Sequence, residues 1–417
     1  MSQEINQLGE HFFRHEYGYL VASLTRKVGV EYIEMVEDAV QSSLLKALGA
    51  WQSKLPKQPK AWLSRVAYNA FIDELRKKKP MQAMPLIESI DTQLSFADKS
   101  DFLESNDLLH MIIICCDLEI PEPSRLVLCL KVLCGFNVAE IAQRLFITEA
   151  NVHKRYQRAR SVLRQKSDQF NDCLFDVSGV STKHVDSVLN VLYVLFTEGY
   201  LSSSIDFSIR LDLCEESERL LKLLTRTHVG NIPKAYALLA LMTFNLARMH
   251  ARQDVHGALL LLEEQDRDTW NIDLINQGFS YLALSAEGEL LSRYHLEAAI
   301  AAEHCRAKNF ATTNWKNICQ YYEQLEKLFS SYFYRLNRAI ALAEWKGAKC
   351  GLELLLEDET PTWVSESYLW FAVAADLYER CGMREKAKSH LTLAMQNAPT
   401  RRVKELIAKR FRRNGEK

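Results

Sequence analysis

The sequence is poor in the residues that form turns. Its 417 residues include 15 glycines and 9 prolines, about half of their usual combined share. This scarcity disfavours β-sandwiches, barrels and glycine-rich phosphate loops. No apolar stretch approaches the ~20 residues that a bilayer-crossing helix needs. With 48% hydrophobic and 25% charged residues, the composition predicts an all-α, non-membrane protein of two or three domains.

The usual signatures of metal sites and export are also missing. The ten cysteines include no CxxC pair, which favours reduced, buried thiols over a zinc site or disulfides. The start, MSQEINQLGEHFF, has no basic segment followed by an apolar block, so we expect no secretory signal and a cytoplasmic location. No Ser/His/Asp, metal-ligand or phosphate-loop pattern is visible. The sequence therefore predicts neither an enzyme nor a bound cofactor.

The charges balance overall but are segregated along the chain. Lys and Arg total 52 against 53 Asp and Glu. Residues 46–79 carry a local net charge of +7, residues 80–122 carry −8, and residues 148–166 carry +5. A single basic run is usually a solvated helix face. Two basic segments on separate helical units, each with its own motif, favour nucleic-acid binding.

The first helical unit ends near residue 80. In VEDAVQSSLLKALGAW, Val36, Val40, Leu44 and Leu48 recur every four residues, which predicts a helix with one apolar face and leaves Asp38, Gln41 and Ser42 on another. The prolines of QSKLPKQP (52–59) end this helix.

A second helix is predicted in KAWLSRVAYNAFIDELRKKK. One face aligns Arg65, Asn69, Asp73 and Arg76, and Trp62 lies near its start. Guanidinium groups neutralise phosphate, aromatic rings stack on bases and an amide reads a base edge, so this face suits single-stranded DNA. The alternative is a surface Arg–Asp ion pair beside a core tryptophan.

The second helical unit predicts a helix-turn-helix. Gly135 breaks the apolar helix SRLVLCLKVLC, VAEIAQRLF forms a short helix, and Thr148 caps EANVHKRYQRARSVLRQK. Val152 and Tyr156 begin the apolar face of that basic helix, whose other side would enter the major groove. The alternative is ordinary three-helix packing with a basic surface.

Together, these units resemble the sigma factors of bacterial RNA polymerase, extracytoplasmic-function (ECF) group. VEDAVQSSLLKALGAW resembles the region 2 helix that docks on the polymerase clamp, and PKAWLSRVAYNAFIDELRKKK resembles the part that melts and reads the promoter −10 element. VAEIAQRLFITEANVHKRYQRARSVLR resembles region 4, which reads the −35 element. The group usually has a carboxylate at the position of Ser42 and a glycine at that of Phe146.

The resemblance implies roles for individual residues. Contacts with core RNA polymerase would fall to Asp38, Gln41 and Ser42. The −10 contacts would fall to Trp62, Arg65, Asn69, Arg76, Lys77, Lys78 and Lys79. The −35 contacts would fall to Asn151, His153, Lys154, Arg155, Gln157 and Arg158.

We expect four segments: region 2 (1–80), an acidic linker (81–108), region 4 (109–170) and a helical extension (183–417). The residue pattern Phe371, Ala375, Tyr378, Gly382, Ala387, Leu391, Ala394 and Pro399 predicts a tetratricopeptide-like repeat in the extension. The turn around Glu263–Asp268 suggests capping and ion-pair roles rather than catalysis. VLYVLFTEGYLSSS and LLLLEEQDRDTWN resemble the C-terminal part of one sigma subgroup.

Three functions compete at this stage. The first is a sigma factor that binds core polymerase and promoter DNA, with an extension that contacts its own sigma regions, the polymerase or another protein. The second is an autonomous helix-turn-helix regulator. The third is a repeat scaffold whose basic helices are incidental. A clamp-docking helix and a melting segment favour the first.

Overall fold

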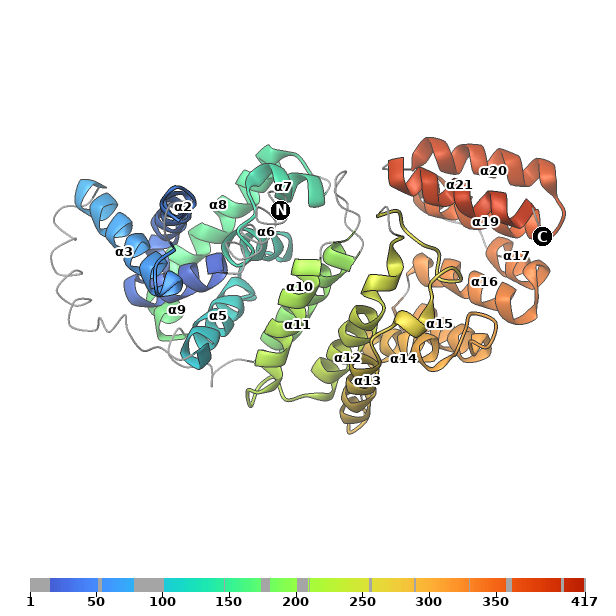
Figure 1. Cartoon of the computed structure of the whole chain (residues 1–417), viewed down its shortest axis with the longest axis horizontal. Helices are drawn as coiled ribbons and strands as arrows, with labels where there is room; N and C mark the ends of the chain where they lie inside the picture. Colours follow the sequence, from blue (N-terminus) through green and yellow to red (C-terminus); the bar gives the residue numbers. More distant parts are fainter. Residues whose placement is uncertain are drawn as a thin grey trace. The chain divides into compact units, whose positions relative to one another are not determined.

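A computed structural model describes most of the chain. The described residues are 16–51, 55–78, 101–145, 147–173, 181–200, 209, 211–254, 257–288, 290–329, 331–357, 362–398 and 401–415. They form helices joined by short turns, with one isolated bridge between Gln253 and Leu259 (Figure 1). The prediction of an all-α fold is confirmed. None of the described helices combines the length and hydropathy of a membrane span.

The chain divides into two compact units. Unit 1 comprises residues 1–199 and 215–231, and unit 2 comprises residues 200–214 and 232–417. The first two helices of the extension are α10 (Thr182–Tyr200) and α11 (Leu211–Thr225). Most of both helices therefore clusters with the sigma-like segments rather than with the rest of the extension.

The described part of unit 1 begins with a helical segment at 16–28 and contains two sets of helices. Near the N-terminus these are η1 (Val30–Tyr32), α2 (Ile33–Ala50) and α3 (Pro59–Lys78). The next set is α5 (Asp101–Cys115), α6 (Glu122–Val132), α7 (Val138–Arg144), α8 (Glu149–Gln165) and α9 (Ser167–Cys173), followed by α10 (Thr182–Tyr200) and α11 (Leu211–Thr225). The end of the predicted acidic linker is thus already helical in α5; residues 79–100 lie outside the described part.

Local signals explain the helix boundaries in the second set. Gly135, with φ of +67°, turns the chain after α6. Asn137 and Glu140 then form a reciprocal capping box, each side chain accepting from the other's backbone N–H at 2.9 Å. Thr148 caps α8 by accepting from Asn151 N at 3.2 Å, as predicted. These caps position the short helix and the basic helix of the helix-turn-helix.

Unit 2 is an array of helices in which successive elements pack on one another. It comprises α12 (Pro233–Ala247), η2 (Met249–Arg252), η3 (Arg267–Thr269), α13 (Ile272–Ser285), α14 (Arg293–Arg306) and α15 (Trp315–Phe329). It continues through α16 (Tyr332–Lys346), α17 (Ala348–Leu356), α18 (Thr362–Ser365), α19 (Tyr368–Arg380), α20 (Arg384–Asn397) and α21 (Arg401–Gly415).

Small residues allow the helices of unit 2 to cross closely. A Cβ at Gly351 would lie 2.5 Å from the Ala339 carbonyl oxygen, and one at Gly278 would lie 2.6 Å from the Phe244 ring. In the predicted repeat, Ala375 is buried, as are Ala387 and Ala394, while Pro399 lies outside the described residues. The close crossings follow the prediction, and the tetratricopeptide assignment itself stays a prediction.

The turn at Glu263–Asp268 has the structural role that the sequence suggested. Asp266 caps η3 by accepting from Asp268 N at 3.0 Å. Glu264 pairs with Lys409 at 2.9 Å. Arg267 donates to the carbonyls of His304 and Ala307 at the end of α14, at 2.7 and 2.8 Å. The turn is therefore fastened to its own unit by caps and ion pairs.

Candidate polymerase and promoter interface

Helix α2 presents an exposed strip beside the predicted polymerase contacts. Asp38 and Gln41 are exposed and Ser42 is half-buried. Leu45 and Leu48 extend the strip along the same side, with 69% and 49% of their surfaces exposed. Exposed leucines next to polar groups are typical of a binding face.

The predicted position of Leu48 on the buried face of α2 is wrong. Val36 and Val40 are fully buried, and Leu44 is half-buried. Each step of four residues rotates around the helix by about 40° more than a full turn, so Leu48 lies about 120° away from Val36. Because of this rotation, Leu48 lies on the exposed strip and not in the core.

Helix α3 carries the predicted −10 face. Arg65, Asn69, Asp73 and Arg76 are all exposed along one side, while Leu63 and its apolar neighbours are buried. Near the C-terminal end, Glu74 pairs with Lys78 at 3.0 Å and Lys77 at 3.9 Å. The hydrogen bond and charge of Lys78 lower the pKa of Glu74. Lys79 lies outside the described residues.

A tryptophan pair closes the connection between α2 and α3. The rings of Trp51 and Trp62 lie 5.7 Å apart between centroids, tilted by 59°. Trp62 is half-buried, so one part of its indole packs on Trp51 while another reaches the surface. Residues 52–54 of the predicted melting loop lie outside the described part.

Helix α8 divides cleanly into a buried face and an exposed face. Val152, Tyr156, Ala159 and Leu163 are buried as predicted. The opposite side carries the predicted −35 residues. Of these, the exposed ones are His153, Lys154, Gln157 and Arg158, and the half-buried ones are Asn151 and Arg155.

The N-terminal part of α8 borders a basic recess of about 230 Å³. Lys154, Arg155 and Arg158 line one wall, and Pro121, Pro123 and Ser124 at the start of α6 line the other. Arg155 Nε donates to Asn151 Oδ1 at 3.2 Å. Three cations around one recess provide the positive potential that a phosphate backbone needs. The paired side chains present hydrogen-bonding groups suited to base edges.

No described His, Cys, Asp and Glu side chains gather in a group of three or more that would hold a metal ion. Four cysteines of the second set are buried in its apolar core: Cys115, Cys116, Cys129 and Cys134. Cys116 Sγ lies 3.8 Å from Cys129 Sγ, and both are fully buried. Burial raises the pKa of both thiols well above its usual range. They are therefore protonated packing groups rather than nucleophiles.

Comparison with known proteins decides among the competing functions. The model of sigma-70 region 2 matches residues 13–80, and that of sigma-70 region 4 matches residues 110–163. The ECF RNA polymerase sigma factor SigM of Mycobacterium tuberculosis is 26% identical over 157 residues, covering 37% of this chain and 74% of SigM. The chain belongs to the sigma-70 family. It is an RNA polymerase sigma factor of the ECF type with a C-terminal extension.

The extension has its own relatives. Residues 184–286 match a family of unknown function, DUF6596. The uncharacterized protein R00370 of Rhizobium meliloti is 30% identical over 329 residues, which cover 78% of this chain and 77% of that protein. No solved structure matches the chain. The sigma prediction is confirmed, and membership of this family implies binding to core RNA polymerase and promoter DNA.

Proposed function

We propose that three exposed faces of unit 1 bind three different targets: core RNA polymerase, the −10 element and the −35 element. The strip on α2, centred on Asp38 and Gln41, binds core RNA polymerase. The face of α3 from Arg65 to Arg76 and the Trp62 ring hold the −10 element. The exposed face of α8 reads the −35 element. As a non-enzymatic specificity factor, the chain acts with the polymerase in the cytoplasm.

The observation that carries this assignment is that α8 has one buried face and one exposed face. A helix whose back is packed by Val152 and Leu163 is fixed in orientation, so its front side chains are presented together. That front is rich in cations and amides, the groups that pair with guanine and adenine. Polymerase binding is supported by the exposed leucines of α2, which are costly to leave in water.

In-vitro transcription with core polymerase over a promoter library tests this function. We expect transcripts that require both polymerase and this chain, from promoters sharing two short elements at a fixed spacing. Sequence-specific binding of the chain to DNA, with no effect on polymerase, would instead support an autonomous regulator.

We further propose that the extension regulates the sigma regions to which it is joined. The contacts of α10 with the first turns of α6 and with Asp117, which precedes α6, support this. His184 Nε2 lies 2.8 Å from Asp117 Oδ2, Arg125 donates to Ser187 Oγ at 2.9 Å, and Asn190 donates to Glu122 at 3.0 Å. A covalent link keeps such modest contacts populated because it raises the local concentration to about the millimolar range.

Truncation can separate the parts of the extension. A chain ending after Asn171 lacks α10 and α11, whereas one ending after Asn231 keeps all of unit 1. We expect the two truncations to differ from each other in transcription output at equal folded concentration. Equal output from both truncations and the full chain would remove the regulatory role.

A further inference from the structure

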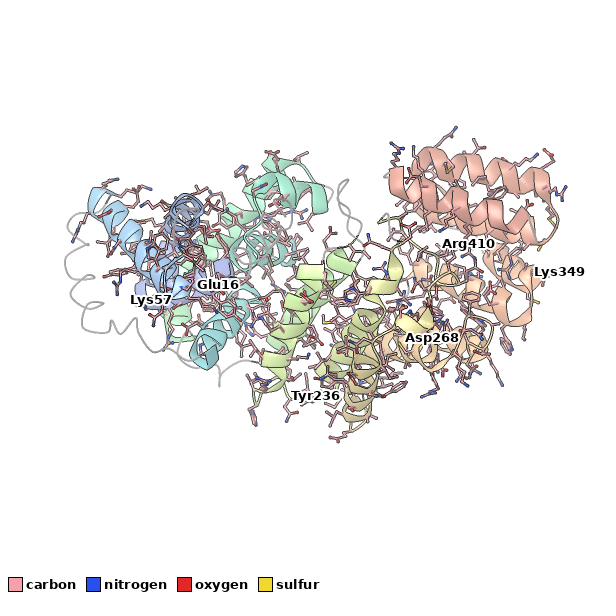
Figure 2. The ribbon with its side chains drawn as sticks, in the orientation of Figure 1. Glu16, Lys57, Tyr236, Asp268, Lys349 and Arg410 are labelled. Carbon is pink, nitrogen blue, oxygen red and sulfur yellow. The ribbon has the colours of Figure 1, made fainter. Side chains whose placement is uncertain are left out.

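Three arginines of unit 2 share two aromatic rings and have no carboxylate partner. Arg248 follows the last residue of α12, Arg252 ends η2 and Arg267 begins η3. Arg252 is 8% exposed, and the other two are half-buried. Within the described part of the chain, none of the three forms an ion pair with Asp or Glu. Even Asp266 and Asp268 (the latter labelled in Figure 2), which flank Arg267 in the sequence, are exposed and do not pair with it.

The rings of Tyr200 and Trp270 hold the three guanidinium groups in one cluster. Arg252 Cζ lies 3.6 Å from the centroid of the Tyr200 ring, and Arg248 Cζ lies 5.6 Å from the same centroid. The centroid of the Trp270 ring lies 5.9 Å from Arg248 Cζ and 5.0 Å from Arg267 Cζ. Arg248 is therefore the central cation, because it contacts both rings. All five residues belong to unit 2 and to the segment that matches DUF6596.

The positive charges of the cluster act on one another. Burial lowers the pKa of the Arg252 guanidinium, and the charge of Arg248 lowers it further. The same two causes lower the pKa of Arg267. Contact with an aromatic face offsets only part of the cost of taking a guanidinium group out of water. The cluster therefore lacks negative charge.

Carbonyl groups at helix ends supply part of that negative charge. Arg252 donates to the carbonyl of Tyr200, the last residue of α10. Arg267 donates to two carbonyls at the end of α14, and Arg248 lies at the C-terminus of α12. A helix C-terminus carries about half a negative charge, so three of them leave about 1.5 positive charges unbalanced. This excess matches the charge of one phosphate group, about −1.5 to −2 at pH 7.

The centre of the cluster also has N–H groups without acceptors. Arg248 Nε is buried and has no hydrogen-bond partner among the described residues. The same holds for Nε1 of Trp270, a residue that is 6% exposed. Both groups donate and cannot accept, and a buried donor without an acceptor is costly. Two such donors beside an excess of positive charge fit the oxygen atoms of an anion.

We propose that Arg248, Arg252 and Arg267 form a binding site for a phosphate group, carried by inorganic phosphate or by a phosphomonoester. Arg248 supplies the donors that no protein group uses, while carbonyl groups fix the positions of the other two cations. Because Arg248 is only half-buried, solvent reaches the site. The proposed polymerase and promoter faces belong to unit 1, so this site adds a small-molecule binding activity that does not rest on them.

Chemical denaturation of the full-length chain, without polymerase or DNA, tests the site. A ligand that binds only the folded chain raises the unfolding midpoint as its concentration increases. We expect inorganic phosphate to raise the midpoint more than chloride does at the same ionic strength. Adenosine monophosphate is the second probe, since its base can stack on the flanking rings. A larger rise with this probe would identify a phosphomonoester as the ligand, and an equal or smaller rise would identify inorganic phosphate.

Substitutions locate the bound phosphate. Arg248→Gln removes a charge-assisted hydrogen bond and should weaken phosphate binding at least about tenfold. Arg248→Lys keeps the charge but loses the Nε donor, so it should weaken binding less and serves as the second variant if glutamine prevents folding. Arg384→Gln is the matched control, because it removes the same charge from an exposed position on α20 and should bind as the wild type does. Arg155→Gln controls for phosphate bound in the basic recess beside α8 and should also keep the response.

Three results would overturn the site. The first is an equal rise with phosphate and chloride, which would mean that salt only screens the three charges. The second is wild-type affinity for phosphate in a folded Arg248→Gln chain. The third is a response that Arg155→Gln abolishes, because the phosphate would then lie at α8. None of these results involves transcription, so failure of the proposed sigma function is a separate outcome.

Discussion

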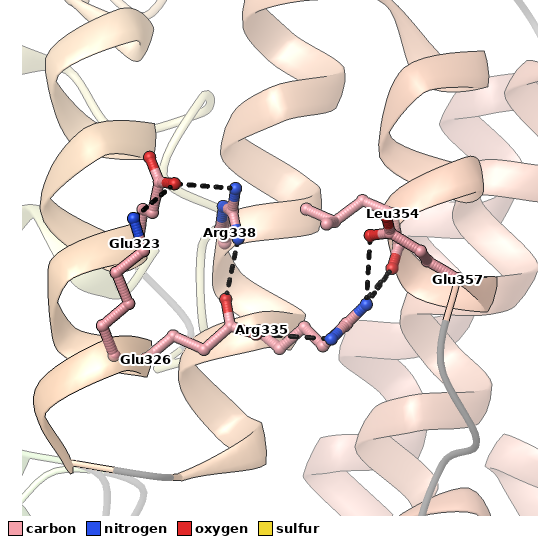
Figure 3. Close-up of polar contacts among 7 residues, drawn as sticks. Glu323, Glu326, Arg335, Arg338, Leu354 and Glu357 are labelled. Carbon is pink, nitrogen blue, oxygen red and sulfur yellow. Dashed lines mark hydrogen bonds and ion pairs between the residues drawn. The ribbon is translucent and has the colours of Figure 1, made fainter.

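The two units of this sigma factor use buried charge in different ways. In unit 1, Glu37 and Glu34 meet Tyr156 and Arg160, partners 119 and 126 residues away in sequence. In unit 2, Arg335 of α16 donates to Leu354 O of α17 at 3.1 Å and pairs with Glu326 and Glu357, partners 9 to 22 residues away (Figure 3). Unit 1 is joined by contacts between residues far apart in the sequence, whereas unit 2 is joined by contacts between helices that are near each other in the sequence.

The same local scheme recurs along unit 2. Arg380 of α19 pairs with Glu344 of α16 at 2.6 Å. Arg410 of α21, labelled in Figure 2, donates to buried Asp376 of α19 at 2.7 Å. Each arginine links helices that are adjacent or nearly so in the array. Such an arrangement gives a stack whose stability is nearly a sum of the contacts between neighbouring helices.

The largest expected effect comes from cutting one of these local links. Arg335 is buried and bonded to three groups, so Arg335→Ala leaves the Leu354 carbonyl and Glu326 without that donor. We expect a loss of about 3 kcal/mol in the unfolding free energy of unit 2, measured by chemical denaturation. Arg306→Ala is the control: its side chain is 66% exposed in a weak pair with Glu303, and it should cost under about 0.5 kcal/mol. Equal losses would contradict the local scheme.

A substitution on the exposed face of α8 should change the DNA sequence preference without changing the unfolding free energy. Arg155→Ala should cost about 1–3 kcal/mol in promoter binding and relax preference at one −35 base pair. Binding to a set of −35 variants measures this. An equal loss on every variant would make Arg155 a phosphate contact, and no loss would place α8 away from the DNA.

The −10 face is expected to act on strand opening. Extruding a base costs a few kcal/mol, which stacking and amide contacts offset. Trp62→Ala and Asn69→Ala should therefore reduce transcription from duplex promoters by about tenfold more than from a template with a pre-melted bubble. Parallel assays on the two templates provide the test; equal defects would argue against a melting role.

The buried side chain of His304 in unit 2 should make the unfolding free energy depend on pH. Burial, with help from the charges of Arg248 and Arg267, lowers the pKa of His304 to about 3. As the pH falls, His304 takes up a proton in the unfolded chain before it does so in the folded chain. Its contribution to the unfolding free energy is therefore fully present above pH about 6.5 and declines as the pH falls towards 3. The loss is about 1 kcal/mol at pH 5.5. Denaturation of His304→Gln between pH 7.5 and 5.5 should show a flatter profile. A folded His304→Gln chain with the wild-type slope would contradict this origin of the pH dependence.

The sequence predicted the helices and the outward faces of this protein well, because both depend on local spacing. Thr148 at the cap, the aligned face of α3 and the two sides of α8 all follow from helical periodicity. Two charged residues also lie at positions where the polarity pattern predicts burial. Glu37 lies on the apolar stripe of Val36 and Val40, and Arg160 follows buried Ala159. A charge on a buried stripe predicts a partner, but its identity depends on contacts more than a hundred residues apart.

The sequence did not predict that α10 and α11 group with the sigma regions, because this grouping also depends on contacts between residues far apart in the sequence. Composition changes little across residues 183–231, and a boundary drawn from motifs falls where the motifs end. The roles assigned to single side chains on α2, α3 and α8 remain predictions, because helical periodicity places a side chain on a face but does not identify what binds there.

The hydrogen bond between Arg155 and Asn151 has a consequence for reprogramming promoter choice. The hydrogen bond orients the two side chains before DNA binds. The base preferences of positions 151 and 155 are therefore not independent of each other. Replacing Asn151 alone would also release the guanidinium of Arg155 and blur preference at its base pair. New −35 specificities should therefore arise from paired substitutions at 151 and 155, and libraries that vary one position at a time would miss most of them.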